Sequence, residues 1–264
     1  MTRGVLPRVL VTVAMAVAAA LAVARAAQPA PDDRRSGYDF MTPALRAMQD
    51  DETSNPGTLW VGEGEALWST KAGADERWCA SCHGDAATSM RGVAARYPAF
   101  DDASGAPVTL SGRINACRVR HQRAPRLDRE NDTLLALEAF VARPSRGQPV
   151  APPADARLAP GRARGEALFR QRMGQLDLSC AQCHDANAGR RLAGSVIPQG
   201  HPTGYPIYRL EWQSVGSLAR RIRGCMTGVR AEPFGDDAPE AVDLELYLKQ
   251  RAAGLPVETP AVRP

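Results

Sequence analysis

Hydrophobic residues recur at the spacing of an amphipathic helix in four stretches of this chain. Two of them are residues 133–142 (TLLALEAFVA) and 241–250 (AVDLELYLKQ). The other two begin at Gly64 with GEALW and at Gly165 with GEALF. Aromatic residues are few, with five Phe and five Tyr, whereas Ala and Leu are abundant. We therefore expect a mainly α fold whose core is light in aromatic side chains.

The four predicted helices belong to two copies of one repeat. Gly64 precedes Cys79 by fifteen residues, and Gly165 precedes Cys180 by fifteen residues. Farther along, the pentapeptides RINAC and RIRGC occupy matching places, and a predicted closing helix follows each of them. The chain is therefore predicted to be a tandem duplication of two small helical domains.

Composition divides the rest of the chain. A proline-rich segment without hydrophobic periodicity separates the copies and predicts an extended linker. The segment before the first copy has too few apolar residues for a third domain, so we expect an extension that wraps over the globular part or contacts a partner. The predicted order is an N-terminal extension at residues 27–57, a first domain at 58–145, a linker at 146–160 and a second domain at 161–264.

Residues 1–26 have the organisation of a signal peptide. A short basic segment carries Arg3 and Arg8, an apolar run follows, and Ala24-Arg25-Ala26 is an A-x-A cleavage site. The alternative is an uncleaved membrane anchor, for which the run is short and is closed by Arg25. We expect export to the periplasm, where thiols oxidise unless they are protected, and a mature protein without a membrane segment.

Removal of this leader changes the charge of the protein. The formal net charge of the full chain is +4, and the leader holds three arginines and no acid, which leaves the mature chain at +1. Nucleic acid is therefore not an expected partner, and local clusters of charge matter more than the total.

Two pentapeptides, CASCH and CAQCH, carry the most specific chemistry in the sequence. In C-x-x-C-H the two thiols form thioethers with the vinyl groups of a haem, and the histidine ligates its iron. The alternatives are a redox C-x-x-C pair, which favours a preceding strand, a zinc site, which needs four closed ligands, and disulfides. We predict two covalently bound haem c groups, with thioethers and proximal ligands at Cys79, Cys82, His83, Cys180, Cys183 and His184. The tandem duplication is therefore predicted to consist of two small class I cytochrome c-like domains.

One further cysteine follows each motif at a matching repeat position. Cys117 and Cys225 stand where a small cytochrome c usually carries a methionine as second axial ligand, and we predict that both ligate iron as thiolates. A Cys117–Cys225 disulfide is the alternative, although equivalent positions in adjacent domains usually lie farther apart than the about 7 Å between Cα atoms that a disulfide allows. His121 could compete with Cys117 for iron. The remaining candidates are expected to have other roles in the core or on the surface: His201, Met90, Met173 and Met226.

The segment around Cys225, LARRIRGCMTGVRAEPF, holds four arginines and no acid before Glu232. Guanidinium groups bind oxyanions through paired hydrogen bonds and lower the pKa of a nearby thiol. We therefore identify Arg221, four residues before Cys225, and less firmly Arg230, five residues after it, as catalytic residues with Cys225. A solvated face or a docking surface for an acidic partner is the alternative. Arg113 matches Arg221 in the repeat, so an arginine there could instead hold a haem propionate in both copies.

Residues 200–234, the two C-x-x-C-H motifs and the downstream LELYLKQRAAGLPVE resemble the SoxA family, the subunits of the SoxAX cytochrome complex of sulfur-oxidising bacteria. The resemblance covers nearly all of the mature chain and implies an L-cysteine S-thiosulfotransferase. Such an enzyme joins thiosulfate to a cysteine of the carrier SoxYZ and passes two electrons through haem to a SoxX-type cytochrome c in a heterodimer. The resemblance also implies that His184 and Cys225 are the axial ligands of the active-site haem, with Cys225 often a persulfide.

Two rival functions and the role of the first haem stay open. A thiolate ligand lowers the potential of iron, so a His83/Cys117 haem is a poor electron acceptor with a structural or vestigial role. A dihaem cytochrome that only relays electrons needs both motifs but no sulfur ligand ringed by arginines. A peroxidase-like dihaem enzyme needs a displaceable distal ligand. The distinguishing question is whether Cys225 ligates iron and carries extra sulfur.

Overall fold

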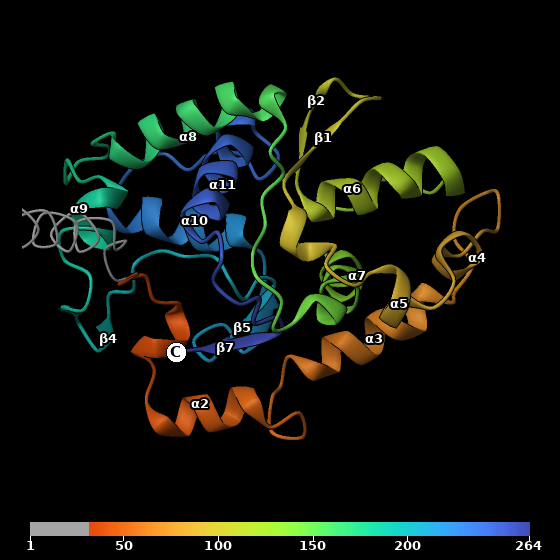
Figure 1. The fold of residues 1–264 in the computed structure, drawn as a ribbon, viewed down its shortest axis with the longest axis horizontal. Helices are drawn as coiled ribbons and strands as arrows, with labels where there is room; N and C mark the ends of the chain where they lie inside the picture. Colours follow the sequence, from red (N-terminus) through yellow and green to blue (C-terminus); the bar gives the residue numbers. More distant parts are fainter. Residues whose placement is uncertain (1–31) are drawn as a thin grey trace, which may run out of the picture. The chain divides into compact units, whose positions relative to one another are not determined.

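Two groups of helices, one from each half of the chain, build the fold of residues 32–264, the part that this computed structural model describes (Figure 1). The first group consists of α3 (Thr58–Trp68), α4 (Cys79–His83), α5 (Ala86–Ser89), α6 (Leu110–Cys117) and α7 (Asp132–Ala142). The second consists of α8 (Ala159–Arg170), α9 (Cys180–His184), α10 (Leu218–Gly228) and α11 (Pro239–Arg251). Shorter elements are α2 (Pro43–Asp50), η1 (Gly37–Phe40), η2 (Ala94–Arg96), η3 (Arg118–Gln122), η4 (Arg143–Ser145) and η5 (Ala156–Leu158). The expected mainly α fold is confirmed.

The predicted signal peptide, residues 1–26, lies outside the described residues. Between residues 32 and 264, no helix combines the length and the apolar character that crossing a membrane requires. Residues 34–264 form a single unit.

The glycine of each GEAL motif lies where the first and last helices of a half cross. Helix α3 packs on α7, and α8 packs on α11. A Cβ atom on Gly64 would come within 3.0 Å of the Ala136 carbonyl, and one on Gly165 would come equally close to the Asp243 carbonyl. Side-chain atoms essentially never approach backbone so closely, so the repeat keeps glycine there because the helix axes are too close for any Cβ.

The helices that carry Cys117 and Cys225, α6 and α10, both begin at a hydroxyl N-cap in the same repeat position. Thr109 Oγ1 accepts a hydrogen bond from the Gly112 N–H at 3.1 Å at the start of α6. Ser217 Oγ accepts one from the Arg220 N–H at 3.1 Å at the start of α10. Each cap satisfies one of the free N–H groups of the first helical turn and contributes about 1 kcal/mol.

The structure also contains short strands, which were not predicted from the sequence. All of them except the last one along the chain come before α6 or α10 in their half. In the first half β1 (Ala99–Asp101) pairs antiparallel with β2 (Ala106–Val108). In the second half β5 (Ile207–Arg209) pairs antiparallel with β6 (Ser214–Gly216) and parallel with β7 (Ala261–Arg263), and a small hairpin joins β3 (Arg191–Leu192) to β4 (Ser195–Val196). Strands of two or three residues are too short to show hydrophobic alternation, which explains the omission.

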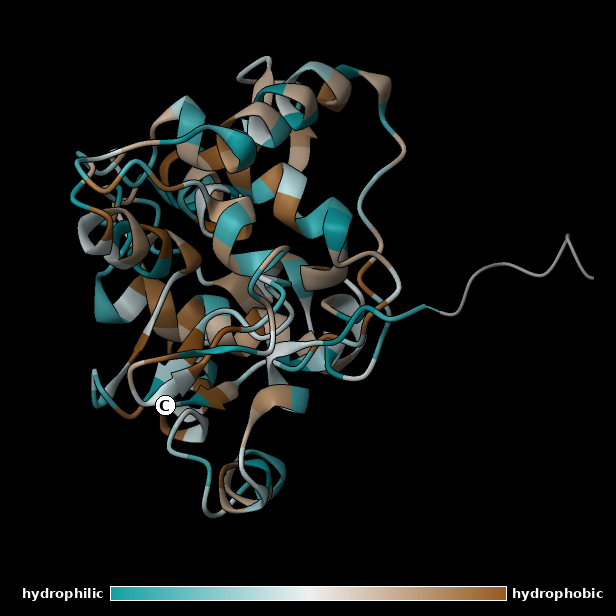
Figure 2. Cartoon of the chain, turned by 90° about the vertical axis from the view of Figure 1, so that its left-hand side faces the viewer, coloured by the Kyte–Doolittle hydropathy of each residue, from teal (hydrophilic) through white to brown (hydrophobic). Residues whose placement is uncertain are grey.

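Each half has its own buried core next to its first motif cysteine. In the first half Trp68, Leu110 and Val141 belong to the cluster against which Cys79 packs. In the second half a cluster that includes Phe169 packs against Cys180. The helices accordingly carry hydrophobic residues on some sides and hydrophilic residues on others (Figure 2). The two attachment cysteines therefore border apolar surroundings.

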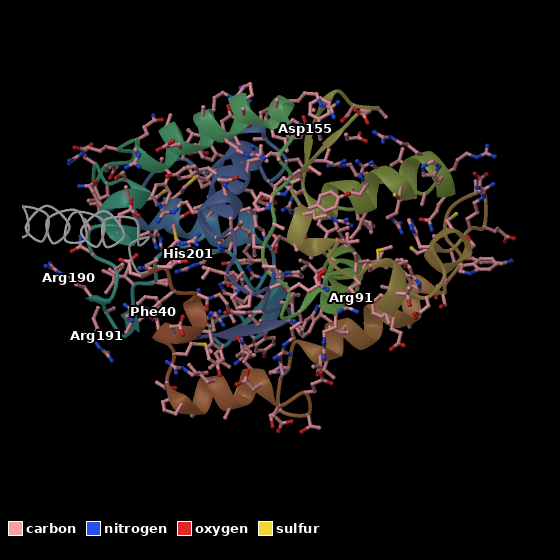
Figure 3. The ribbon with its side chains drawn as sticks, viewed as in Figure 1. Phe40, Arg91, Asp155, Arg190, Arg191 and His201 are labelled. Carbon is pink, nitrogen blue, oxygen red and sulfur yellow. The ribbon has the colours of Figure 1, made fainter. Side chains whose placement is uncertain are left out.

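The N-terminal extension contacts the second half of the chain. Helix α2 packs beside β7. Asn55 Nδ2 donates to the Pro260 carbonyl at 2.9 Å, and His201 Nδ1 lies 2.7 Å from the Arg35 carbonyl. The Arg35 guanidinium in turn lies 4.8 Å from the centre of the Phe40 ring, and Phe40 and His201 are labelled on the same side in Figure 3. These contacts show that the extension wraps over the globular part, and they give His201 a structural role.

The segment between the halves is extended but not detached. The Val150 N–H donates to the Leu255 carbonyl at 2.8 Å, and the Gly147 N–H donates to the Val257 carbonyl at 2.8 Å. Val150 is fully buried. The prolines and the lack of hydrophobic periodicity predicted the extended conformation. The pairing with the C-terminal segment could not be predicted, because it joins residues that are far apart in the sequence.

Candidate functional site

The second C-x-x-C-H motif forms the single helical turn α9, whose start is fixed by a capping box. Ser179 Oγ accepts a hydrogen bond from the Gln182 N–H at 3.2 Å, and Gln182 Oε1 accepts one from the Ser179 N–H at 2.8 Å. This turn places Cys180, Cys183 and His184 together, each only partly buried. Two thiols and an imidazole on one turn are the arrangement that thioether attachment of haem requires.

The imidazole of His184 is oriented by a backbone carbonyl. Its Nδ1 lies 2.7 Å from the Pro198 carbonyl, so Nδ1–H donates and Nε2 keeps its lone pair for a metal. Gly200, at φ +75°, lies against the ring, since a Cβ there would be 3.1 Å from His184 Cγ. The tautomer and the orientation of the ring both fit an axial ligand of haem iron.

Cys225 on α10 faces His184 and has an anion-stabilising environment. Burial raises the pKa of the Cys225 thiol, but a hydrogen bond with His184 and the charges of Arg221 and Arg209 outweigh it, so the pKa lies below its ordinary value. Burial and the neighbouring Cys225 instead raise the pKa of Cys180 to about 11. The structure thus brings the predicted pair His184 and Cys225 together.

Arg221 is the arginine of this segment whose charge most lowers the pKa of Cys225. It lies one helical turn before Cys225, and within residues 32–264 its guanidinium has no carboxylate partner. A charged group without a counterion in a half-buried position attracts an anion. The other three arginines have different partners: the Trp212 ring for Arg220, Asp236 for Arg223 and Gln175 for Arg230.

Arg230 is exposed, and its side chain contacts Gln175. It follows the end of α10 at φ +58°, and its Nη1 donates to Gln175 Oε1 at 3.4 Å. Its side chain lines a groove of about 490 Å³ with Met226 and Phe234. The structure therefore separates the two arginines that the sequence placed on either side of the cysteine.

Arg209 is a residue of this site that sequence reasoning missed. It ends strand β5, is 9% exposed and forms an ion pair with Glu211 at 3.1 Å. Its Nε has no hydrogen-bond partner in the described part of the chain. Burial and the nearby Arg221 both lower the pKa of Arg209. Tyr205 lies in the same group, since burial raises its pKa while Arg221 lowers it. Two guanidinium groups thus converge beside one thiol.

The first half repeats the haem-attachment turn. Cys79, Cys82 and His83 form α4, and the His83 ring lies 5.7 Å from the Trp68 ring between centroids. Burial raises the pKa of Cys117, and Cys82 raises it further. Cys117 therefore lies close to the motif of its own half, as Cys225 does in the second half.

Both arginines beside Cys117 are held by a buried carboxylate, whereas Arg221 beside Cys225 has no carboxylate partner among the described residues, and this is the main difference between the halves. Asp101 Oδ1 lies 2.8 Å from Arg113 Nη1, and Asp101 Oδ2 lies 2.6 Å from Arg120 Nη2. The hydrogen bond from Arg120, with the charge of Arg113, holds the pKa of Asp101 below its ordinary range. Arg113, the counterpart of Arg221, is thus engaged by a buried carboxylate. Asp101 lies 16 residues before Cys117, as Arg209 lies 16 residues before Cys225.

Several alternatives considered for the sequence find no support in the geometry. All six cysteines are free, so Cys117 and Cys225 are not joined. Within the described range, no three His, Cys, Asp or Glu side chains gather as a metal-binding group, so the motifs do not form a closed zinc site. His121 is exposed in η3. Met90 and Met226 are buried core residues.

Known proteins resemble this chain in sequence and in structure. The family model for the cytochrome c domain of SoxA/TsdA matches it twice, at residues 63–150 and 164–257. The L-cysteine S-thiosulfotransferase subunit SoxA of Rhodovulum sulfidophilum is 37% identical over 232 residues, which cover 88% of this chain and 81% of that protein. The subunit of the same name from Pseudaminobacter salicylatoxidans is 37% identical over 245 residues, covering 91% and 86%. The crystal structure of SoxXA from P. pantotrophus matches with a TM-score of 0.84 and 31% identity over 88% of this chain and 87% of that one.

The two matched segments correspond to the two helical groups and confirm the tandem duplication. Cytochrome c domains carry covalently bound c-type haem, and the attachment turns α4 and α9 fit that cofactor. This chain belongs to the SoxA family of c-type cytochromes.

Proposed function

We propose that this chain is the haem-bearing subunit of an L-cysteine S-thiosulfotransferase and that the chemistry takes place beside Cys225. The reversal of charge between matching positions carries the proposal. Asp101 forms an ion pair with Arg113 in the first half, whereas in the second half Arg209 stands in its place, pairs with Glu211 and leaves Arg221 without a carboxylate partner among the described residues. An anionic substrate is therefore attracted to the second half.

Thiosulfate is a dianion, and the acceptor cysteine reacts as a thiolate, so the reaction must bring two anionic sulfurs together. One sulfur–sulfur bond forms, the cysteine is left with a singly charged thiosulfonate, and two electrons are released. If the acceptor begins as a thiol, one proton also passes to water. The bound haem supplies the electron-accepting centre through which these electrons leave to a cytochrome c partner.

Arg221 binds and orients the sulfonate oxygens, because a guanidinium donates paired hydrogen bonds and stays charged. Arg209, which is held by Glu211, adds a second buried guanidinium that is already in place beside Cys225 before the substrate arrives and helps to lower the repulsion between the two sulfurs. The sulfur of Cys225 lies next to both guanidinium groups. Arg230 is the second arginine predicted from the sequence, and its exposed position suits the approach of an anion better than contact with Cys225.

The proposed haem ligands follow the repeat. In the second half Cys180 and Cys183 would form the thioethers, and His184 and Cys225 would bind the iron. In the first half the corresponding residues are Cys79, Cys82, His83 and Cys117. Because Asp101 engages both arginines there, we assign the first haem a structural or vestigial role and no contact with thiosulfate.

The partners follow from the same assignment. A SoxX-type cytochrome c is the proposed second subunit, since the matched crystal structure is that of SoxXA. The carrier SoxYZ provides the acceptor cysteine. The predicted signal peptide would deliver the mature chain to the periplasm.

Reconstitution tests the proposal. The haem-bearing complex with its cytochrome partner is mixed with thiosulfate, the reduced carrier protein and oxidised cytochrome c, and the intact mass of the carrier is measured. We expect the carrier to gain one thiosulfonate for every two cytochromes reduced. Cytochrome reduction by another donor without any change in carrier mass would contradict the transferase and leave an electron relay.

A further inference from the structure

A small cavity lies between the two halves and is lined by ionisable groups. Its volume is about 20 Å³, which is room for a single water molecule. Arg129 and Glu138 reach it from the first half, and Glu245 and Lys249 reach it from the second. Glu138 lies on α7, whereas Glu245 and Lys249 lie on α11, so the closing helices of both repeats meet at this charge cluster.

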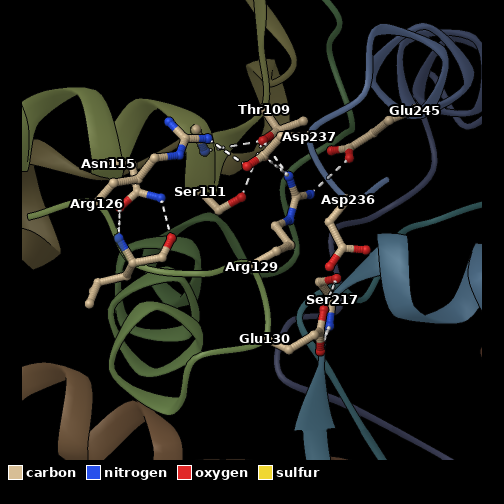
Figure 4. A network of polar contacts seen from close by, with 12 residues as sticks. Thr109, Ser111, Asn115, Arg126, Arg129, Glu130, Ser217, Asp236, Asp237 and Glu245 are labelled. Atoms are coloured by element: carbon tan, nitrogen blue, oxygen red, sulfur yellow. Dashed lines mark hydrogen bonds and ion pairs between the residues drawn. The ribbon is translucent and has the colours of Figure 1, made fainter. Parts of the chain in front are cut away.

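The polar atoms around this cavity are buried and incompletely paired. Glu138 is 8% exposed, and its Oε2 has no hydrogen-bond partner among the described residues. Arg129 Nη1 donates to Thr109 Oγ1 at 2.8 Å and its Nη2 to Glu245 Oε2 at 3.2 Å, contacts that are drawn in Figure 4. Lys249 Nζ donates to a backbone carbonyl at 2.9 Å. Glu138 is thus the acid of the cluster that lacks a direct partner.

The cluster is linked to the helix that carries Cys225. Ser217, the N-cap of α10, lines the cavity, and its hydroxyl donates to Glu130 (Figure 4). The cavity also borders both haem-binding cores. Leu110, in the core cluster next to Cys79, and Leu218, in the core cluster next to Cys180, both line it. A change of charge in either haem pocket is therefore felt in the cavity through apolar, low-dielectric surroundings.

The charges that face Glu138 come from both halves. Burial raises the pKa of Glu138 to about 7; Glu245 and Glu130 also raise it, while Arg129 and Lys249 lower it. Two tyrosines, Tyr97 and Tyr205, complete the titratable groups around the cavity. The carboxyl therefore exchanges its proton near neutrality, where a modest change in local charge alters its occupancy.

We propose that Glu138 is a redox-linked proton site shared by the two halves. When an electron enters a haem, the added negative charge favours protonation, and Glu138 takes up a proton from solvent. The only bond formed is the O–H of its carboxyl, and the proton returns to solvent when the electron passes to the cytochrome partner. This role requires bound haem and is independent of the identity of the sulfur substrate.

Redox titrations of the purified complex across neutral pH test this proposal. We expect the reduction equilibrium of the wild type to become less favourable as pH rises, by at most tenfold per pH unit for one proton per electron. Glu138→Gln, which keeps the size of the side chain but cannot ionise, should remove most of this dependence. Glu65→Gln, an exposed residue on α3, is the matched control and should behave as the wild type.

Haem propionates can also give pH-dependent potentials, and the variants separate the two sources. Equal pH dependence in the wild type and in Glu138→Gln overturns the proposal, as does a wild type with no pH dependence. If Glu138→Gln does not fold, Glu138→Asp should move the pH range over which the potential changes, and an unchanged range also overturns it. A reduced-minus-oxidised infrared spectrum should show a protonated carboxyl gained on reduction in the wild type and missing in Glu138→Gln.

Discussion

Asp101 and Arg209 occupy the same place in the two halves of the chain and carry opposite charges. Each ends the first strand of a short hairpin, and each lies 16 residues before the lone cysteine of its half. Asp101 engages Arg113 beside Cys117, whereas Arg209 lies beside Arg221. With Arg209 in place of an aspartate, Arg221 therefore lacks the carboxylate partner that its counterpart Arg113 has, and it remains available to an anion.

The two matched arginines should differ in their effect on turnover. Arg221→Gln is expected to lower kcat/KM for thiosulfate by about 10- to 100-fold, because hydrogen bonds to charged groups contribute about 1.5–3 kcal/mol. Arg113→Gln should leave kcat/KM near the wild-type value, since Asp101 already engages that guanidinium. Steady-state assays of both variants decide the matter, and equal losses would contradict the assignment.

Arg209→Asp gives the second half the charge pattern of the first. The new carboxylate should pair with Arg221 and remove it from the substrate, so the loss of kcat/KM is expected to be at least as large as in Arg221→Gln. Arg209→Lys keeps the charge and should retain more activity. Activity of Arg209→Asp close to that of the wild type would show that this position does not influence the site.

Gly165 should not tolerate a side chain. In Gly165→Ala the new Cβ meets the Asp243 carbonyl of α11, so we expect a loss of about 1–3 kcal/mol or more in the free energy of unfolding. Gly62 in α3 faces open space where a Cβ would stand, so Gly62→Ala should be neutral or stabilising by up to about 1 kcal/mol. Thermal unfolding of the two variants tests this, and similar melting temperatures would disprove the close helix crossing.

The stability of the protein should carry a pH dependence from Glu138. Its pKa is raised from 4.5 to about 7 by burial, so between these values the folded state holds a proton that the unfolded state releases. Stability from this group is therefore present at low pH and decreases as pH rises through that window, by an amount of the order of 3 kcal/mol. The free energy of unfolding of Glu138→Gln should depend less on pH than that of the wild type. Urea unfolding of both proteins below and above this pH window measures the difference between their free energies of unfolding. A difference that stays constant with pH would contradict the prediction.

The sequence predicted what depends on local pattern or on strict repetition. Helical periodicity and the matched GEAL and C-x-x-C-H segments identified the main helices, and the matching pentapeptides RINAC and RIRGC identified Cys117 and Cys225. Arg209 could not be recognised as a site residue by itself, because it reaches Cys225 only when β5 pairs with β6 in front of α10. Aligning the two repeats over the residues before Cys117 and Cys225 would have shown that Arg209 and Asp101 occupy matching positions with opposite charges.

Arg230 shows the limit of reasoning from sequence distance. Five residues separate it from Cys225, but the left-handed backbone at the end of α10 turns its side chain towards Gln175. Arg221 remains close because a continuous helix fixes the direction of a residue four positions away. Proximity along the chain therefore predicts proximity in space only where one regular element spans both residues.

The most direct test of the central claim is mass spectrometry, without reductant, of the haem-bearing complex after incubation with thiosulfate that carries a heavy isotope in its outer sulfur. We predict labelled sulfur on the peptide that contains Cys225, because its thiolate can take the outer sulfur of thiosulfate as a persulfide while sulfite leaves, and none on the peptide that contains Cys117. Label on Cys117, or a cross-linked Cys117–Cys225 peptide, would contradict the account.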